Sequence, residues 1–437
     1  MSRKMRVLWF SDILLPDAAT QLGRSSFGTG WWKAALADEL KRIGDIELAV
    51  CTAVPGATAT NFVAAGIRCY LIPEPRASSD SAIARALSQC ADVVRGWNPD
   101  LLHYHGTEGF YSLLSARNLT AVPSVISLQG LMGPCSRWPA FFGDAGPLRI
   151  AQMHRWVEPL IARGLIWTYA RYRRQAVVER EVISTGNTFL GRTEWDRAYV
   201  RSLNPSARYC TVGELLRREF WEQPAWSIDC AVRHRIVFSN AGQPRKGVET
   251  LLESLDILQQ RYPDVHLQLC GTISARSGYG RYLRRRVHSY GGVVSLLGHL
   301  EGPQLAQVLR SANVFASASF IDNSPNSVCE AMLVGVPCVC SYTGGTPSLL
   351  EHGRSGLFVP PGDPEMLAER IASIFDNDKL ACRLGATARI TAIERHDPAL
   401  VMKQLLDAYS DALACPDDLS HNMGVASSAI SGNLTLA

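Results

Sequence analysis

Short apolar runs alternate with helix-like stretches through the first half of the chain. Five such runs, each of strand length, lie at residues 5–10, 46–50, 67–72, 101–105 and 124–128. Between them apolar positions recur with helical spacing, as at residues 30–43 and 81–96. Strands and helices that alternate in this way form a parallel sheet with helices on both faces. The first half is therefore predicted to be an α/β domain.

The second half repeats this alternation independently of the first. Its apolar runs lie at residues 235–239, 265–270, 293–297, 314–317, 336–341 and 357–359, and its helical patterns at 247–261, 302–311, 325–334 and 364–375. Each half is long enough to bury a core of its own. The pattern predicts two Rossmann-like domains with parallel sheets that face an interdomain cleft.

The domain boundary is expected where the periodicity breaks, around residues 220–232, in W-E-Q-P-A-W-S-I-D-C. This predicts a first domain at residues 1–225 and a second at 226–397. A helical pattern that starts near His396 predicts a terminal helix over 398–415. The small and polar residues 416–437 are expected to form a flexible tail.

The composition is that of a globular protein, with 47% hydrophobic and 19% charged residues among 437. The 12 cysteines show no C-x2-C pair or other metal-ligand spacing, which suits a reducing cytosol. The basic N-terminus turns polar at Ser11 and Asp12, too early for a signal peptide. No run reaches the roughly 20 apolar residues that a membrane span needs. We expect a soluble, cytoplasmic protein.

Arginines and aromatic residues gather between residues 149 and 180, in a chain of net charge +4. The aromatic residues there include Trp156, Trp167, Tyr169 and Tyr172. Such a segment could contact an anionic membrane surface or an anionic acceptor. The simpler interpretation, which we place first, is a pair of helices with aromatic side chains in the core and arginines in water. No nucleic-acid-binding motif accompanies the charge.

The segment from Asp322 to Gly345 carries the strongest chemical signal. It reads D-N-S-P-N-S-V-C-E-A-M-L-V-G-V-P-C-V-C-S-Y-T-G-G, with seven residues between Asp322 and Glu330. Ser324 is a suitable N-cap and Pro325 a suitable first helical residue. The free backbone N–H groups of such a helix start attract phosphate. Phosphate-binding groups between two carboxylates that accept from hydroxyls indicate a nucleotide-sugar site.

This segment resembles the E-x7-E region of family 4 (group 1) glycosyltransferases, retaining enzymes with the GT-B fold. The resemblance implies that Glu330 binds the nucleotide ribose, that Asp322 contacts the donor sugar, and that backbone N–H groups of Asn326 and Ser327 meet the diphosphate. Two departures stand out: Asp322 replaces the usual Glu, and N-S-P replaces the common G-F-G. The resemblance also implies that the C-terminal helix crosses back onto the first domain.

A second resemblance lies in S-N-A-G-Q-P-R-K-G-V-E-T-L-L, residues 239–252. Arg245 and Lys246 precede a helix, where cations are unfavourable to the helix dipole and so indicate a bound anion. The segment is similar to the family's R-K-G element, which implies that Lys246 reaches the donor phosphates. Where many members carry a further Arg, this chain has Asn240, and Arg245 is a candidate replacement.

The first domain offers candidate residues at the ends of its strands. His103 and His105 end one strand, where side chains face the ligand crevice of a parallel sheet. The resemblance places His105 near the reaction centre, and His103 is expected to be a hydrogen-bonded core residue. Gly28 matches the family's glycine loop after the first strand. No third ligand has a helpful spacing for a metal site.

Three further segments have expected structural or supporting roles. Thr193 and Asp196 in G-R-T-E-W-D-R-A read as a capping box. Arg192 and Arg197 could face the cleft, as in similar stretches of bacterial polysaccharide-type members. S-L-Q-G at residues 127–130 could shape the acceptor pocket. The backbone of Gly344 and Gly345 could approach the donor.

The sequence thus predicts a metal-independent, retaining glycosyltransferase without a cofactor. Its catalytic candidates are His105, Lys246 and Asp322. It would move a sugar from a nucleoside-diphosphate donor to a saccharide or lipid-linked acceptor, in cell-surface polysaccharide or glycolipid synthesis. The alternatives are another GT-B-like enzyme, such as a sugar phosphorylase or a nucleotide-sugar epimerase, and a nucleotide-sugar-binding protein with little catalysis. The pyridoxal-phosphate lysine motif that would favour a phosphorylase is missing. A dinucleotide dehydrogenase is disfavoured, because neither half has the glycine fingerprint.

Overall fold

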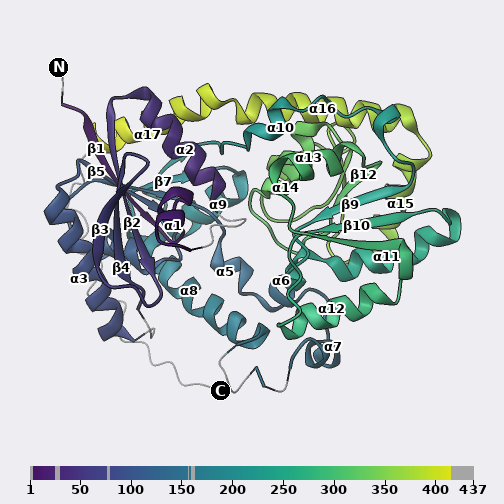
Figure 1. The fold of residues 1–437 in the computed structure, drawn as a ribbon, viewed down its shortest axis with the longest axis horizontal. Helices are drawn as coiled ribbons and strands as arrows, with labels where there is room; N and C mark the ends of the chain where they lie inside the picture. The colour runs from purple at the N-terminus through teal and green to yellow at the C-terminus, as the bar shows by residue number, and fades with distance from the viewer. Residues whose placement is uncertain (1–2, 25–29, 76–78, 156, 159–162, 415–437) are drawn as a thin grey trace.

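The computed structural model describes residues 3–24, 30–75, 79–155, 157–158 and 163–414. Within these residues the chain forms two parallel-sheet domains that lie side by side (Figure 1). The first domain, coloured purple to teal, and the mainly green second domain are joined along one edge by the yellow C-terminal helices. The predicted α/β architecture with two Rossmann-like domains is confirmed, while the boundary at residues 225 and 226 stays a prediction.

The first sheet has eight strands in the described residues, in the order β3-β4-β2-β1-β5-β6-β7-β8. Every neighbouring pair is parallel except β3 and β4. The strands are β1 (Met5–Ser11), β2 (Ile46–Val54), β3 (Thr60–Ala64), β4 (Ile67–Pro73), β5 (Leu101–His105), β6 (Ser124–Ser127), β7 (Thr188–Gly191) and β8 (Arg208–Thr211). The five predicted strands are all present, and β3, β7 and β8 are additional.

Helices cover both faces of this sheet. They are α1 (Pro16–Gln21), α2 (Trp31–Ile43), α3 (Asp80–Trp97), α4 (Leu113–Ala116), α5 (Met132–Cys135), α8 (Leu165–Thr185) and α9 (Glu194–Leu203). Three short helices, α6 (Trp138–Phe142), α7 (Pro147–Gln152) and α10 (Arg218–Glu222), instead place buried residues in the core of the second domain. Successive residues of a strand point to opposite faces. Accordingly Val7 and Trp9 of β1 belong to one buried cluster, and Leu8 and Phe10 to another. The first domain therefore has a core on each side of its sheet.

The second sheet has six parallel strands in the order β11-β10-β9-β12-β13-β14. They are β9 (Arg235–Ser239), β10 (His266–Cys270), β11 (Val294–Gly298), β12 (Val314–Ser317), β13 (Cys338–Ser341) and β14 (Leu357–Val359). The helices are α11 (Val248–Arg261), α12 (Gly278–His288), α13 (Gly302–Arg310), α14 (Asn326–Val334), α15 (Pro364–Phe375) and α16 (Asp378–His396). All six strands predicted for this half are present. Short 3-10 turns join some of these elements, among them Pro244–Lys246 and Thr346–Ser348.

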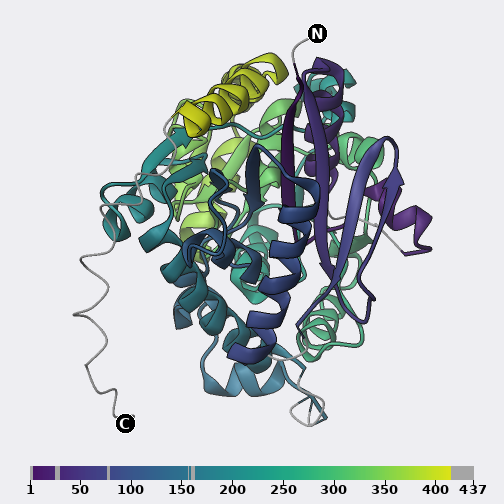
Figure 2. The same ribbon diagram turned by 90° about the vertical axis from the view of Figure 1, so that its left-hand side faces the viewer.

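The last described helix, α17 (Pro398–Ala414), packs on the sheet of the first domain. Its residues Val401, Leu405 and Tyr409 lie in the same buried cluster as Trp9. Figure 2, which is viewed from the first-domain side, shows this helix in yellow above the strands. The predicted crossing back is confirmed, and the helix begins at Pro398, as the predicted range 398–415 does, after α16 ends at His396. The predicted tail at 416–437 lies outside the described residues.

None of the described helices is long and apolar enough to cross a membrane.

Candidate active site

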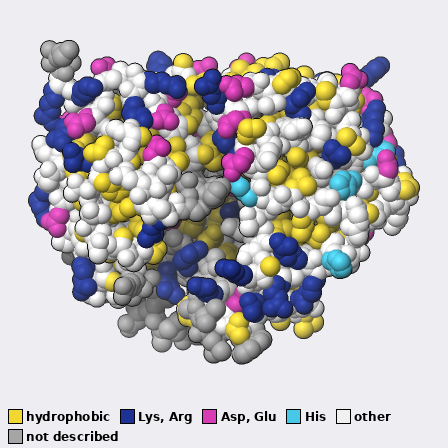
Figure 3. Space-filling view, in the orientation of Figure 1, with side chains coloured by type: hydrophobic (Ala, Val, Ile, Leu, Met, Phe, Trp, Pro, Cys, Tyr) yellow, Lys and Arg dark blue, Asp and Glu magenta, His cyan; other side chains and the backbone are white. Residues whose placement is uncertain are grey.

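A cleft of about 780 Å³ lies between the two domains. Figure 3 shows the surface hollowed between the two halves of the molecule. Trp31 and Trp32 of α2 line the cleft from the first domain, and Asn240, Ser327 and Glu330 line it from the second. Asn240 directly follows β9, at the carboxyl end of a parallel strand where ligands of open α/β sheets bind, and Ser327 and Glu330 lie in the first turns of α14. The cleft therefore has the position of a substrate site.

The start of α14 faces this cleft, one residue later than predicted. Pro325 is the N-cap and Asn326 the first helical residue, because Pro325 has an extended ψ of 113°. The prediction of Ser324 as N-cap is therefore wrong. The carbonyl of Pro325 accepts from the N–H groups of Val328 and Cys329 at 2.9 and 3.2 Å. The N–H groups of Asn326 and Ser327 come before the first donors of the helix and have no acceptor within it. Both residues line the cleft.

Glu330 lies about one turn into α14 and is only 3% exposed. Its Oε1 accepts from Nε of Arg217 at 2.8 Å and lies 2.8 Å from Nη2 of the same guanidinium. Burial raises the pKa of Glu330 to about 7, although Arg217 opposes this shift. The guanidinium of Arg217 also lies 5.1 Å from the ring centre of Trp31. The predicted ribose ligand thus lies in the cleft and contacts a cation that sequence reasoning missed.

Lys246 and Asp322, which were given separate roles, form a buried ion pair. Burial lowers the pKa of Lys246, although Asp322 opposes this shift. Burial would raise the pKa of Asp322, but the charges of Lys246 and Arg245 lower it below its ordinary value. Asp322 is therefore a carboxylate held by two cations. The 3-10 turn that contains Arg245 and Lys246 leads directly into α11.

Gly344 and Gly345 pack tightly against the Asp322 loop. Gly344 has a φ of +52°, and a Cβ there would lie 1.9 Å from the carbonyl oxygen of Asp322. A Cβ on Gly345 would lie 2.2 Å from the carbonyl oxygen of Asn323. The N–H of Gly345 donates to the Asp322 carbonyl at 3.0 Å. The two glycines thus support the Asp322 loop, and the approach of their backbone to a donor stays a prediction.

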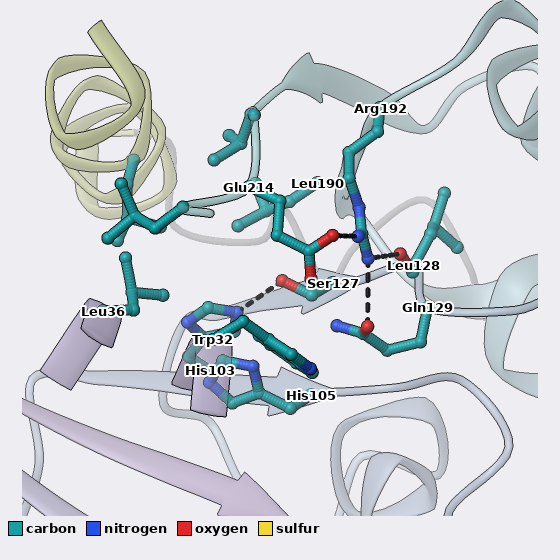
Figure 4. Close-up of a pocket in the computed structure, with 14 residues that line it drawn as sticks. Trp32, Leu36, His103, His105, Ser127, Leu128, Gln129, Leu190, Arg192 and Glu214 are labelled. Atoms are coloured by element: carbon teal, nitrogen blue, oxygen red, sulfur yellow. Dashed lines mark hydrogen bonds and ion pairs between the residues drawn. The ribbon is translucent and has the colours of Figure 1, made fainter. Parts of the chain in front are cut away.

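His105 ends β5 inside a small pocket of about 40 Å³ in the first domain (Figure 4). It is 1% exposed and neither ring nitrogen has a hydrogen-bond partner among the described residues. His103 bonds Tyr409 and Ser127 at 2.7 Å each, as expected for a core histidine. Burial lowers the pKa of His103 to about 3 and that of His105 well below its ordinary value. Both imidazoles are neutral, and His105 has a donor and an acceptor available for a ligand.

An ion pair between Arg192 and Glu214 forms the opposite wall of this pocket. Arg192 Nη2 also donates to the carbonyl of Leu128 at 2.9 Å and to Oε1 of Gln129 at 3.0 Å. The sequence suggested that Arg192 could face the cleft. It gave no indication of a role for Glu214, which lies in the link between the two sheets. Arg197 does not line this pocket, since its guanidinium lies over Tyr209 at 5.0 Å.

Gly28 lies outside the described residues. Among the residues that are described, no group of three or more His, Cys, Asp or Glu is arranged to hold a metal ion.

Comparisons with known proteins identify the second domain. Residues 233–391 match the family model described as glycosyl transferases group 1. A phosphatidyl-myo-inositol mannosyltransferase from Mycobacterium leprae is 30% identical over 168 residues, which are 38% of this chain and 43% of that protein. The match thus spans less than half the length of this relative.

Two solved structures share the two-domain fold. Sucrose-phosphate synthase from Thermosynechococcus elongatus has a TM-score of 0.66 and 16% identity, and covers 94% of this chain and 100% of its own. HepE of Anabaena in complex with UDP-glucose has a TM-score of 0.63 and 16% identity, with coverage of 93% and 100%. At this identity the likeness establishes the fold. Residues 233–391 thus match the glycosyl transferases group 1 family, and the chain as a whole has the two-domain GT-B fold of these structures.

Proposed function

We propose that this protein is a retaining glycosyltransferase that moves a sugar from a nucleoside-diphosphate donor to a saccharide or lipid-linked acceptor. The observation that carries the proposal is the arrangement in and beside the cleft. The start of α14 and Glu330 line the cleft, and the Lys246–Asp322 ion pair lies at the Asp322 loop that directly precedes them, all within the segment that matches the family. The mannosyltransferase relative and the UDP-glucose bound to HepE support the same class of reaction.

In this proposal the second domain binds the donor. Glu330 accepts hydrogen bonds from the ribose hydroxyls, and the N–H groups of Asn326 and Ser327 bind the diphosphate. Lys246 and Arg245 supply positive charge, and Asp322 accepts from a hydroxyl of the donor sugar. Charge that develops on the leaving diphosphate is stabilised by cations and N–H groups that are already in place, which is commonly the largest catalytic term.

The acceptor approaches from the first domain, where His105 is buried and unpaired. A hydroxyl oxygen of the acceptor forms the new bond to the anomeric carbon of the donor sugar. It does so on the same face from which the phosphate oxygen leaves. The acceptor's proton passes to that leaving oxygen, and the configuration is retained. Domain closure excludes water, which would otherwise compete with the acceptor.

We also propose that the protein contacts the cytoplasmic face of a membrane through α8. Ile166, Trp167 and Val177 are exposed on this helix, at 55%, 40% and 69%. Arg171, Arg173 and Arg174 are exposed beside them. Figure 3 shows Lys and Arg gathered over the region where α8 and α12 lie in Figure 1. Exposed aromatic and basic side chains favour an anionic membrane surface.

Co-sedimentation with vesicles tests this contact. The native protein should pellet with anionic phospholipid vesicles and remain in solution with neutral ones. Replacement of Arg171, Arg173 and Arg174 by Gln should abolish pelleting. Equal pelleting of the native protein with both kinds of vesicle, or with none, would contradict the proposal.

Nucleotide binding and turnover test the main proposal. Thermal unfolding is measured with UDP, GDP, ADP and CMP, for the native protein and for Glu330→Ala. A ligand at about 100 times its Kd adds roughly 2.7 kcal/mol of stability. A rise in Tm with one base, lost in Glu330→Ala, is the expected result. Release of nucleoside diphosphate that depends on an acceptor then excludes a protein that only binds nucleotide sugars.

A further inference from the structure

Asn323 belongs to the second domain, but its side chain is bonded entirely to the first. It follows Asp322 directly and is 4% exposed. Its Nδ2 donates to Oδ2 of Asp196 at 2.9 Å and to the carbonyl of Gln129 at 3.2 Å. Its Oδ1 accepts from Oγ1 of Thr193 at 2.7 Å. Three of the four hydrogen bonds available to an amide side chain therefore cross between the domains.

The first-domain residues that bond Asn323 are also held by hydrogen bonds within their own domain. Thr193 and Asp196 form the predicted capping box of α9, which is confirmed. Asp196 also accepts from the N–H groups of Arg192 and Thr193 at 3.1 and 3.3 Å, and from the hydroxyl of Tyr209. The Asp196 carboxylate, which accepts from Asn323, is thus buried and is oriented by three further hydrogen bonds within the first domain.

The Gln129 contact links Asn323 to the pocket around His105. Gln129 lies in the loop after β6, and its side-chain oxygen accepts from Arg192 at 3.0 Å. Both Gln129 and Arg192 line the pocket that contains His105. One residue therefore connects the loop of Asp322, on the donor side, with the wall of the pocket on the acceptor side.

From this geometry we propose that Asn323 is a positioning residue that couples domain closure to the alignment of donor and acceptor. The inference rests on the function proposed above. Separation of the domains would break three buried hydrogen bonds, each of which is costly to leave unmade. Asp322 is the adjacent residue, so its loop takes its position against the first domain only when the domains are closed. The glycine common at this position in the family has no side chain that could form these bonds.

The test compares Asn323→Ala and Asn323→Asp with Asn204→Ala. Asn204 is a matched control, because it is 7% exposed and donates to the carbonyls of Ile183 and Gly186 at 3.0 and 2.8 Å, inside the first domain. Three quantities are measured for each folded variant: the radius of gyration by small-angle X-ray scattering, the nucleotide Kd by calorimetry, and kcat and KM.

Both Asn323 variants should show a larger radius of gyration and an unchanged nucleotide Kd. Their kcat should fall by about a hundredfold, the loss expected when reacting groups are misplaced by roughly 1 Å. Asn323→Asp keeps the native size of the side chain and places a carboxylate against Asp196, so it should open the domains at least as far as Ala. Asn204→Ala should lower Tm but leave the radius and kcat near native values.

A native radius of gyration and kcat in both Asn323 variants would overturn the proposal. So would an equal loss of kcat in Asn204→Ala, which would assign the effect to stability. The scattering result does not depend on turnover. If the native protein binds no nucleotide, the proposed function fails, while the change of radius still reports on the interdomain bonds of Asn323.

Discussion

Arg217 and buried Glu330 form an ion pair in the wall of the interdomain cleft, with Nε and Nη2 of the arginine both 2.8 Å from one carboxylate oxygen. Arg217 lies in the segment that joins the two sheets, and its guanidinium also lies over Trp31 of the first domain. The proposed ribose ligand is therefore bonded to a residue outside its own domain core. Binding of nucleotide and the position of the linking segment should depend on each other.

Nucleotide affinity should rise with pH through about 7. The pKa of Glu330 is raised to about 7 by burial, and ribose hydroxyls donate to its ionised form. The affinity should increase between pH 5.5 and 8.5, as measured by calorimetry with the nucleotide that raises Tm. Glu330→Gln should bind weakly and with little dependence on pH. A native affinity that is flat over this range would contradict the role of Glu330.

The raised pKa of Glu330 predicts that the free energy of unfolding changes with pH in the opposite direction to nucleotide affinity. The folded protein holds the Glu330 proton more tightly than the unfolded chain does, whose carboxyl has an ordinary pKa of 4.5. The free energy of unfolding should therefore be greatest below pH 4.5 on this account, and fall as pH rises through about 7. Glu108 and Glu249 have pKa values raised to about 7 in the same way. The difference between native protein and Glu330→Gln in urea unfolding isolates the contribution of Glu330.

Lys246→Ala should lower kcat by about a hundredfold to a thousandfold, the loss typical of removing one group that stabilises transition-state charge. The nucleotide Kd should change less, because Glu330 and the start of α14 remain. The variant also removes the cation that is paired directly with Asp322 and leaves only the charge of Arg245, which costs stability. Lys246→Ala with Asp322→Asn should therefore recover Tm without recovering kcat. Recovery of both would show that Lys246 acts only through stability.

Gly344→Ala should destabilise the fold more than Gly353→Ala does. Both glycines have positive φ, at +52° and +73°, so each alanine adds roughly 1–2 kcal/mol of backbone strain. At Gly353 a Cβ would meet nothing within 4 Å, whereas at Gly344 it would lie 1.9 Å from the Asp322 carbonyl oxygen. Urea unfolding of the two variants measures the difference, which is the cost of displacing the Asp322 loop. Equal losses would mean that the loop adjusts freely.

Tyr409→Phe should destabilise the first domain and leave nucleotide binding unchanged. The hydroxyl of Tyr409 accepts from Nε1 of Trp9 at 3.2 Å and bonds Nδ1 of His103 at 2.7 Å. Its removal leaves two buried groups without a partner, at a cost of about 1–3 kcal/mol each. Calorimetry should show a lower Tm, and the nucleotide Kd should match that of the native protein. A weaker Kd would show that the effect reaches the second domain.

The local pattern of apolar residues in the sequence was sufficient to predict most of the strands and helices. The strands of the second domain were recovered because their residues are largely buried and form clear apolar runs. In the first domain, β3 is an exposed edge strand, β7 reads T-F-L-G with only two large apolar residues, and β8 reads R-Y-C-T and is only partly buried, so none of them forms a clear apolar run. The start of α14 was placed one residue early, because Pro325 suits both the N-cap and the first turn.

The candidate site was predictable only where its residues lie in one segment. Asp322, Asn326 and Glu330 lie in one segment, where their spacing is visible in the sequence. Lys246 lies in the R-K-G turn, which is recognisable in the same way. By contrast Glu330 contacts Arg217 and Asn323 contacts Asp196 across 113 and 127 residues of sequence. Such pairs leave no local pattern, because they depend on how two domains pack.

The position of α17 has a consequence for how the protein is made. The first domain is translated before the second, yet Val401, Leu405 and Tyr409 complete its core. The sheet and helices of the second domain, from β9 to α16, can close before α17 is available. A ribosome adds about 5–20 residues per second, so the first domain waits many seconds with the part of its sheet around β6 and β8 not yet covered by α17. The half that is synthesised first is thus the half that finishes folding last.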